Sequence, residues 1–223
     1  MRILVACEES QAVTIELRKL GHEAYSCDII DCSGGHPEWH IKQDVLPLLN
    51  GNCEFKTMDG LSHIICGKWD MIIAFPPCTY LTNGGAVRMY PKKGIINQER
   101  LKKALESKDF FMKIYNANCE KIVIENPMPM KIVGLPDKTQ VIQPFEYGEP
   151  YSKKTYLWIK GLPNLQPTNI IENYQPFING GGGRLEKPNY KDKKFANGSS
   201  KRSKTFIGIA KAMAEQWGGK LEV

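Results

Sequence analysis

One cysteine follows directly after an apolar segment of the kind that forms a buried strand. Residues 69–75 (WDMIIAF) are almost continuously apolar, and Pro76 and Pro77 fix the backbone before Cys78. A catalytic thiol needs partial exposure and surroundings that favour the thiolate. A lone cysteine is more often a small buried apolar side chain, but the prolines and the position at a strand end favour a nucleophile here.

A carboxylic acid has the equivalent position in the next apolar segment. Residues 121–125 (KIVIE) end at Glu125, and Asn126 and Pro127 follow at once. A thiol and a carboxylic acid on one rim are what nucleophilic addition to a pyrimidine requires. The thiolate attacks C6 of the ring while the acid supplies a hydrogen bond or a proton at N3. C5 then becomes nucleophilic enough to take a methyl group from a sulfonium.

The elements that must position these residues alternate between strand and helix patterns. Residues 2–6 and 23–30 have strand patterns, and between them apolar side chains recur at helical spacing, with Ser10 as the expected N-cap and Gly21 as the end of the helix. Further strands are expected at 69–75, 121–125, 139–144 and 153–160, and helices at 97–115 and 205–217. The sequence therefore predicts an α/β fold with a Rossmann-like, doubly wound, mostly parallel sheet.

Polar or reactive residues occur at or just after the ends of five strands, if a possible third strand before Asp44 is counted. In chain order they are the turn Cys7-Glu8-Glu9-Ser10, then Asp28, Asp44, Cys78 and the pair Glu125-Asn126. In doubly wound sheets, ligands bind at the carboxyl ends of the strands. These residues are therefore expected to line a single crevice.

The first of these turns is acidic and has no glycine. It has neither a G-x-G-x-x-G pattern nor a P-loop, and two carboxylates at a helix N-terminus would repel a phosphate, which argues against NAD, FAD and ATP. S-adenosylmethionine has no phosphate and carries an ammonium and a sulfonium, so an acidic turn could tolerate it. Asp28 is placed to bond ribose hydroxyls. Glu8 and Glu9 could instead stabilise the helix dipole, and the sequence leaves both roles open.

Several sequence blocks together resemble the C5-cytosine DNA methyltransferases. The block DMIIAFPPCTYL is similar to the family's nucleophile motif, and KIVIENP to its Glu-Asn motif. QDVL places Asp44 where the family has an adenine-contacting Asp. YGEPYSKKTYLWI resembles the downstream strand that begins Tyr-Gly-x-Pro, and NGSSKRSKTFIGIAKAMA the last motif. The resemblance spans nearly the whole chain, in the family's order. The Pro-Cys and Glu-Asn pair at this spacing is its most specific part.

The resemblance implies a class I S-adenosylmethionine-dependent methyltransferase fold, with S-adenosylmethionine as cofactor, DNA as partner and DNA (cytosine-5-)-methyltransferase activity. The catalytic residues it implies are Cys78, Glu125, Asn126, Lys153 and Lys154. The cofactor-binding residues are Ala6, Cys7, Glu8, Ser10, Asp28, Ile29, Asp44, Val45, Pro76 and Ser199. The substrate-binding residues are Pro77, Thr79, Asn83, Arg88, Thr155, Arg184 and Lys201. No metal site is expected.

Three features depart from the family pattern. The family's first motif is Phe-x-Gly-x-Gly, where this chain has ACEES. The strand after Tyr-Gly-x-Pro usually carries a Gln and two Arg, where this chain has Tyr151, Lys153 and Thr155. Lys153 or Lys154 could substitute, but a lysine lacks the bidentate fork of Arg. The family also inserts a target-recognition domain where this chain has about 40 residues.

We therefore expect residues 1–160 and 197–223 to form the catalytic, cofactor-binding domain, and 161–196 to be a short basic connector or reduced recognition segment. The stretch 184–204 has eight Lys or Arg and two acidic residues, which could contact phosphates or could be a solvated loop. Reading bases in a duplex needs a recognition module, and the target base must be flipped out. The substrate is then single-stranded DNA, a flipped-out base with weak site preference, or a site that a partner selects. Residues 79–93 could close over it, with Gly84 and Gly85 as hinges.

Composition excludes few classes of protein. The chain has 223 residues and a mild formal net charge of +6, and no apolar run reaches bilayer length. The acidic residues after the first apolar run indicate a strand and not a signal peptide. Seven cysteines without C-x-x-C spacing indicate reduced thiols in a cytoplasmic protein, and not a zinc site or a disulfide framework. His36 and His40 are expected in a polar loop beside a core Trp and not as metal ligands.

Two alternative functions remain open on this sequence. The altered first turn and the absent Arg pair would suit a nucleic-acid-binding protein that keeps the fold but has little activity, although such a protein has no need of both Cys78 and Glu125. The absent recognition domain would suit a C5-modifying enzyme that acts on free pyrimidine nucleotides or transfers a group other than methyl.

Overall fold

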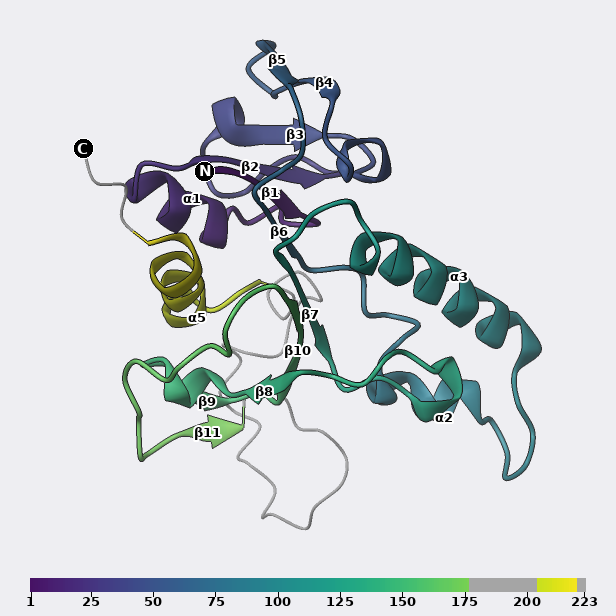
Figure 1. The fold of residues 1–223 in the computed structure, drawn as a ribbon. Coiled ribbons are helices and arrows are strands. Elements are labelled where there is room, and N and C mark those ends of the chain that lie inside the picture. Colours follow the sequence, from purple (N-terminus) through teal and green to yellow (C-terminus); the bar gives the residue numbers. More distant parts are fainter. Residues whose placement is uncertain (177–203, 220–223) are drawn as a thin grey trace.

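The computed structural model describes residues 1–176 and 204–219, which fold around one seven-stranded sheet (Figure 1). Its strands lie in the order β3-β2-β1-β6-β7-β10-β8. Their bounds are β1 Arg2–Ala6, β2 Glu23–Asp28, β3 His40–Lys42, β6 Met71–Ala74, β7 Ile122–Pro127, β8 Gln140–Ile142 and β10 Thr155–Lys160. Strands β3, β2, β1, β6 and β7 are parallel, and β10 runs antiparallel to β7 and β8. The predicted α/β class is confirmed: the sheet is Rossmann-like, doubly wound and mostly parallel.

Helices cover both faces of the sheet (Figure 1). α1 (Ala12–Lys19) and α5 (Ile207–Met213), which a π-helical turn extends over Ala214–Gly218, pack on one face, and α3 (Gln98–Tyr115) lies on the other. The sequences of β1 and β6 are continuously apolar because alternate residues of each strand are buried on opposite faces of the sheet. Ile3 and Ile73 belong to the core under α1 and α5, whereas Leu4 and Ile72 belong to the core under α3.

The register of the central strands places the proposed chemistry at one edge of the sheet. Ala74 at the end of β6 pairs with Ala6 at the end of β1 and with Ile124 in β7. The turn that begins at Cys7 and the segment that leads to Cys78 therefore leave the sheet at the same level. The strand order reverses between β1 and β6, and ligands bind beside such a switch point in open α/β sheets.

The start of α1 differs from the prediction. Ser10 was expected to be the N-cap, but the N-cap is Gln11, whose φ of 57° is left-handed and whose side chain makes no capping bond. The first turn is capped from further upstream, because the Glu8 carboxylate accepts hydrogen bonds from the backbone N–H of Val13 at 2.6 Å and of Thr14 at 3.3 Å. Sequence rules for N-caps consider only the residue next to the helix, so they do not identify a carboxylate such as Glu8, which lies several residues before it.

Several small elements were not predicted. The hairpin of β4 (Cys53–Lys56) and β5 (Ser62–Ile65) lies between β3 and β6 in the chain, and a two-stranded pair joins β9 (Tyr151–Ser152) to β11 (Gln175–Pro176). α2 (Ala86–Met89) is a single turn after Cys78. Short 3₁₀ turns occur at Pro37–Trp39, Leu46–Leu48, Asn83–Gly85, Lys131–Val133 and Pro144–Glu146.

Some predictions lie beyond the described residues. They concern Arg184, Ser199 and Lys201, most of the basic stretch, and the part of the proposed connector after residue 176. In the described parts of the chain, no helix is both long enough and apolar enough to cross a membrane.

Candidate active site

A cavity of about 530 Å³ opens at the carboxyl ends of β1, β2, β3 and β6, beside α3. Its lining residues are Cys7, Cys27, Asp28, Ile29, Gln43, Asp44, Val45, Pro77, Tyr80, Lys103, Glu106, Ser107 and Phe110. Five of the predicted cofactor-binding residues are among them: Cys7, Asp28, Ile29, Asp44 and Val45. The structure thus brings together side chains from three separate turns that the sequence assigned to one crevice, and the volume is in the range of small-molecule sites.

The other predicted cofactor-binding residues do not line this cavity. Ala6 and Pro76 are buried at the ends of their segments, and Ser10 is half-buried in the turn before α1. Glu8 is turned into the N-terminus of α1, where the Thr14 hydroxyl also donates to its carboxylate at 2.7 Å. This is the helix-terminus role that the sequence left open, and it accounts for both carboxylate oxygens of Glu8.

Cys7 has a backbone conformation that favours glycine. Its φ is 59°, in the left-handed region, where a residue with a Cβ atom costs on the order of 1 kcal/mol. Burial and the nearby Asp28 carboxylate hold the pKa of the Cys7 thiol far above its usual range. Cys7 therefore forms a sharp turn next to the cavity, and its protonated thiol is unreactive. It does not share the nucleophilic role expected of Cys78.

The charges around the cavity suit a cationic ligand without phosphate. Asp28, Asp44 and Glu106 supply three carboxylates, against one ammonium from Lys103. That ammonium is itself paired with Glu99, at 3.0 Å. The apolar side chain of Ile29 is 73% exposed at the wall, so a ligand that covered it would remove apolar surface from water.

The wall formed by α3 was missed by the sequence reasoning. Lys103, Glu106, Ser107 and Phe110 have the spacing i, i+3, i+4, i+7, which places them on one face of a helix. The sequence identified the helix and its amphipathic pattern, but it could not show which face meets the crevice. The available signal was a Phe on the same helical face as Lys, Glu and Ser.

The segments that follow β6 and β7 are fixed to each other by three hydrogen bonds. The side-chain amide of Asn126, which is buried, donates to the Pro76 carbonyl at 2.9 Å. The Asn83 N–H donates to the Met128 carbonyl at 2.9 Å, and the Met130 N–H to the Leu81 carbonyl at 2.8 Å. These bonds bracket Cys78, which is half-buried. The role of Asn126 in the structure is therefore to position the Pro-Pro-Cys segment.

Glu125 lies with Lys153 and Thr155 in a second, smaller hollow. Lys204, Thr205, Phe206 and Ile209 form the rest of its wall. Burial raises the pKa of the Glu125 carboxyl, while the positive charge of Lys153 and hydrogen bonding with Thr155 lower it; burial is the largest of these effects. A raised pKa lets the carboxyl keep its proton to higher pH, and in the protonated form it can donate a hydrogen bond. Lys154, the other lysine proposed for this role, is exposed and outside the hollow.

The residues predicted to bind substrate are mostly accessible. Pro77, Thr79, Asn83 and Arg88 are exposed on the segment that follows β6, whereas Thr155 is buried. Arg184 and Lys201 lie outside the described residues.

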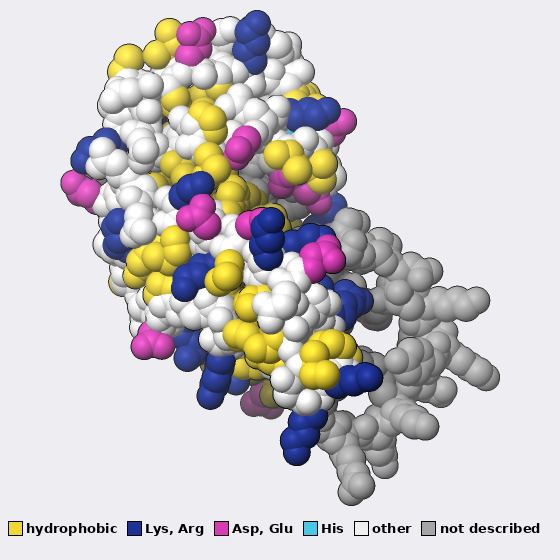
Figure 2. All heavy atoms as spheres, turned by 90° about the vertical axis from the view of Figure 1, so that its right-hand side faces the viewer, with side chains coloured by type: hydrophobic (Ala, Val, Ile, Leu, Met, Phe, Trp, Pro, Cys, Tyr) yellow, Lys and Arg dark blue, Asp and Glu magenta, His cyan; other side chains and the backbone are white. Residues whose placement is uncertain are grey.

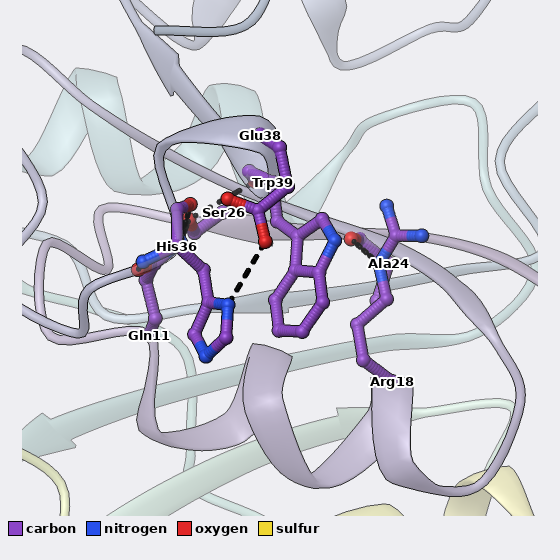
Figure 3. Close-up of polar contacts among 7 residues, drawn as sticks. All are labelled: Gln11, Arg18, Ala24, Ser26, His36, Glu38 and Trp39. Carbon is purple, nitrogen blue, oxygen red and sulfur yellow. Dashed lines mark hydrogen bonds and ion pairs between the residues drawn. The ribbon is translucent and has the colours of Figure 1, made fainter. Parts of the chain in front are cut away.

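The HPEWH segment forms a surface stack (Figure 3). The rings of His36 and Trp39 are 3.9 Å apart and nearly parallel, and Arg18 lies over Trp39 at 5.3 Å. Trp39 is half-buried, and so not the core residue that was expected. His40 is buried and bonded to Ser26 at 2.8 Å. No group of three or more His, Cys, Asp or Glu that could hold a metal occurs within residues 1–176 and 204–219.

Comparisons with known proteins give a distant similarity of fold. No protein-family model matches the chain, and no curated protein matches it. A solved structure from E. coli, provisionally described as a prophage-encoded DNA modification methyltransferase, aligns with a TM-score of 0.41 and 12% identity. The alignment covers 76% of this chain and 51% of that one, so the chain spans about half of that protein's length.

Proposed function

We propose that this protein transfers a methyl group from S-adenosylmethionine to C5 of cytosine in DNA, through a covalent bond between Cys78 and C6 of the base. The observation that carries the proposal is the link between the two segments of the site. Asn126 fixes the backbone two residues before Cys78, and its neighbour Glu125 lies in a hollow where burial raises the pKa of its carboxyl. A nucleophile and an acid on adjoining strand ends are the two groups that addition to a pyrimidine requires.

The cavity fits the proposed cofactor in size and charge. Asp28, at the end of β2, would hold the ribose hydroxyls, and Asp44 the adenine amine, while Ile29, Val45 and Phe110 would cover the apolar faces. The acidic lining suits a ligand with an ammonium and a sulfonium. When bound, S-adenosylmethionine supplies an electrophilic methyl group.

The chain's own residues would prepare the base. The Cys78 thiolate forms a bond to C6, and the electron pair displaced from the C5–C6 double bond moves into the ring. Glu125, in its protonated form, donates a hydrogen bond or a proton at N3, so that the ring accepts this charge. C5 becomes nucleophilic and would take the methyl group, with cleavage of the sulfonium S–CH3 bond and S-adenosylhomocysteine as the leaving group. The C5 proton then passes to a water molecule, the C5–C6 double bond re-forms, and the C6–S bond breaks to release the Cys78 thiolate. The positive charge of Lys153 opposes the effect of burial and lowers the pKa of the Glu125 carboxyl.

The described residues on the face that carries α3 form no continuous basic track. Figure 2 shows the side that carries α3, where Lys and Arg side chains are interspersed with Asp and Glu. Three exposed basic residues, Arg88, Lys92 and Lys93, follow Cys78 in the chain and could contact phosphates near the target base. These contacts would give affinity without sequence information, which fits a weakly specific or single-stranded DNA substrate.

The proposal is tested by methyl transfer from labelled S-adenosylmethionine to mixed-sequence DNA, single- and double-stranded, and in parallel to free cytidine nucleotides. The product is digested to nucleosides and identified by mass, with Cys78→Ala as the control. Labelled 5-methylcytosine that disappears in the variant supports the proposal. Label in free cytidine nucleotides, but in neither form of DNA, would favour the nucleotide-modifying alternative. Binding of DNA without any transfer would favour the binding-only alternative.

A further inference from the structure

One guanidinium fixes the segment that carries Cys78 to α3. Arg100 Nη2 donates a hydrogen bond to the Thr79 carbonyl at 2.8 Å, one residue after Cys78. The backbone of Arg100 is fixed at the start of α3, because its N–H donates to the N-cap side chain of Asn97 at 3.0 Å. The segment is thus held to the first turn of a long helix and not only to the sheet.

The same guanidinium contacts the far end of this segment. A Cβ atom added to Gly85 would lie 2.5 Å from Arg100 Nη2, so the absence of a side chain at Gly85 is what admits the guanidinium. The Nε of Arg100 is buried and has no hydrogen-bond partner among the described residues. A partly desolvated cation is a costly way to stabilise a loop, which suggests a role beyond stability.

Tyr80 connects this contact to the cofactor cavity. Its ring lines the cavity, and the Arg100 Cζ lies 5.0 Å from the ring centroid. Tyr80 is also two residues from Cys78 in the chain. A chain of contacts through Tyr80, Arg100 and Thr79 therefore connects the cavity wall to the segment that carries Cys78.

We propose that Arg100 is a positioning residue that couples the occupancy of the cofactor cavity to the position of Cys78. A ligand in the cavity restrains the Tyr80 ring, and the guanidinium transmits that restraint to Thr79 and so to the thiol. This inference rests on the proposed function, because it takes the cavity to be the cofactor site and Cys78 to be the nucleophile.

The coupling is measured by the alkylation of Cys78 with iodoacetamide, followed by peptide mass spectrometry, with and without S-adenosylhomocysteine. In the wild-type protein the ligand should slow alkylation of Cys78. In Arg100→Met this protection should fall by about tenfold, because a charge-assisted hydrogen bond and a cation–π contact are lost. Lys102→Met, an exposed position on the same helix, is the matched control and should keep wild-type protection. Exposed Cys66 is an internal standard, whose rate the ligand should not change.

A second variant covers the case in which Arg100→Met fails to fold. Gly85→Ala displaces the guanidinium without removing its charge, and it should reduce the protection in the same direction while Arg100→Lys retains part of it. Equal protection in the wild type, Arg100→Met and Gly85→Ala overturns the inference but leaves the proposed function intact. Failure of the wild-type protein to bind S-adenosylhomocysteine at all contradicts the proposed function, and this inference with it.

Discussion

Replacement of Glu8 by glutamine should remove a specific pH dependence of the protein's stability. The Glu8 carboxylate is 3% exposed and accepts hydrogen bonds from Val13 and Thr14. These bonds favour the ionised form, but burial outweighs them and raises the pKa of Glu8 to about 7 from the ordinary 4.5. At about 1.4 kcal/mol for each pH unit between these values, ionisation in the folded state costs about 3 kcal/mol.

The sign follows from the pKa in the two states. Since the folded-state pKa lies above the unfolded-state pKa, the contribution of Glu8 to stability is complete below about pH 4.5 and is lost as the pH rises through about 7. Urea unfolding of the wild type and Glu8→Gln between pH 4.5 and 8, followed by circular dichroism, measures the difference. The wild type should lose up to about 3 kcal/mol more than the variant over this range.

The control for this experiment is Glu120→Gln, at an exposed position. Its unfolding free energy should follow the wild-type pH dependence. Parallel curves for the wild type and Glu8→Gln would refute the reasoning, because they would show that Glu8 is ionised at no cost. The affinity for S-adenosylhomocysteine should stay within about twofold in Glu8→Gln, since the carboxylate is directed at α1 and not at the cavity.

Three further substitutions test other parts of the site. Asn126→Ala should lower the free energy of unfolding in urea by about 1–3 kcal/mol, because the Pro76 carbonyl is left buried without its donor; a change below about 0.5 kcal/mol would contradict that role. Lys153→Met removes the charge that lowers the pKa of Glu125, so the high-pH limb of kcat/KM should move to higher pH. The exposed Lys154→Met is its control, and an equal shift in both variants would argue against a specific pairing. Phe110→Ala opens the cavity wall and should weaken binding of S-adenosylhomocysteine by about tenfold in calorimetry, and unchanged affinity would place the ligand elsewhere.

The parts of the structure that the sequence predicted well depend on local pattern. Continuous apolar runs identified the buried parallel strands, and residues directly after those runs, such as Asp28 and Asp44, do line one cavity. Residues that directly follow buried strands lie close together because parallel strands end at the same edge of a sheet.

The parts that were missed depend on contacts between distant segments. Glu8 was assigned equally to cofactor and helix, and its orientation was decided by unsatisfied N–H groups five and six residues away. Arg100 and the Lys103 face of α3 reach the site because of how the helix is rotated on the sheet, which the helical period alone does not fix. The left-handed conformation of Cys7 was also not predicted, because glycine is the usual sequence signal for such a conformation.

The central claim, a covalent bond from Cys78 to C6 of cytosine, is tested most directly with DNA that contains 5-fluorocytosine. Methyl transfer to C5 of this base leaves no proton to remove, so the thiol cannot be expelled and the adduct persists. If Cys78 is the nucleophile, a denaturation-resistant protein–DNA complex should form only with S-adenosylmethionine, map to Cys78 by peptide mass spectrometry, and be absent in Cys78→Ala. Methylation of ordinary DNA without any trapped complex, or an equal complex in Cys78→Ala, would contradict it.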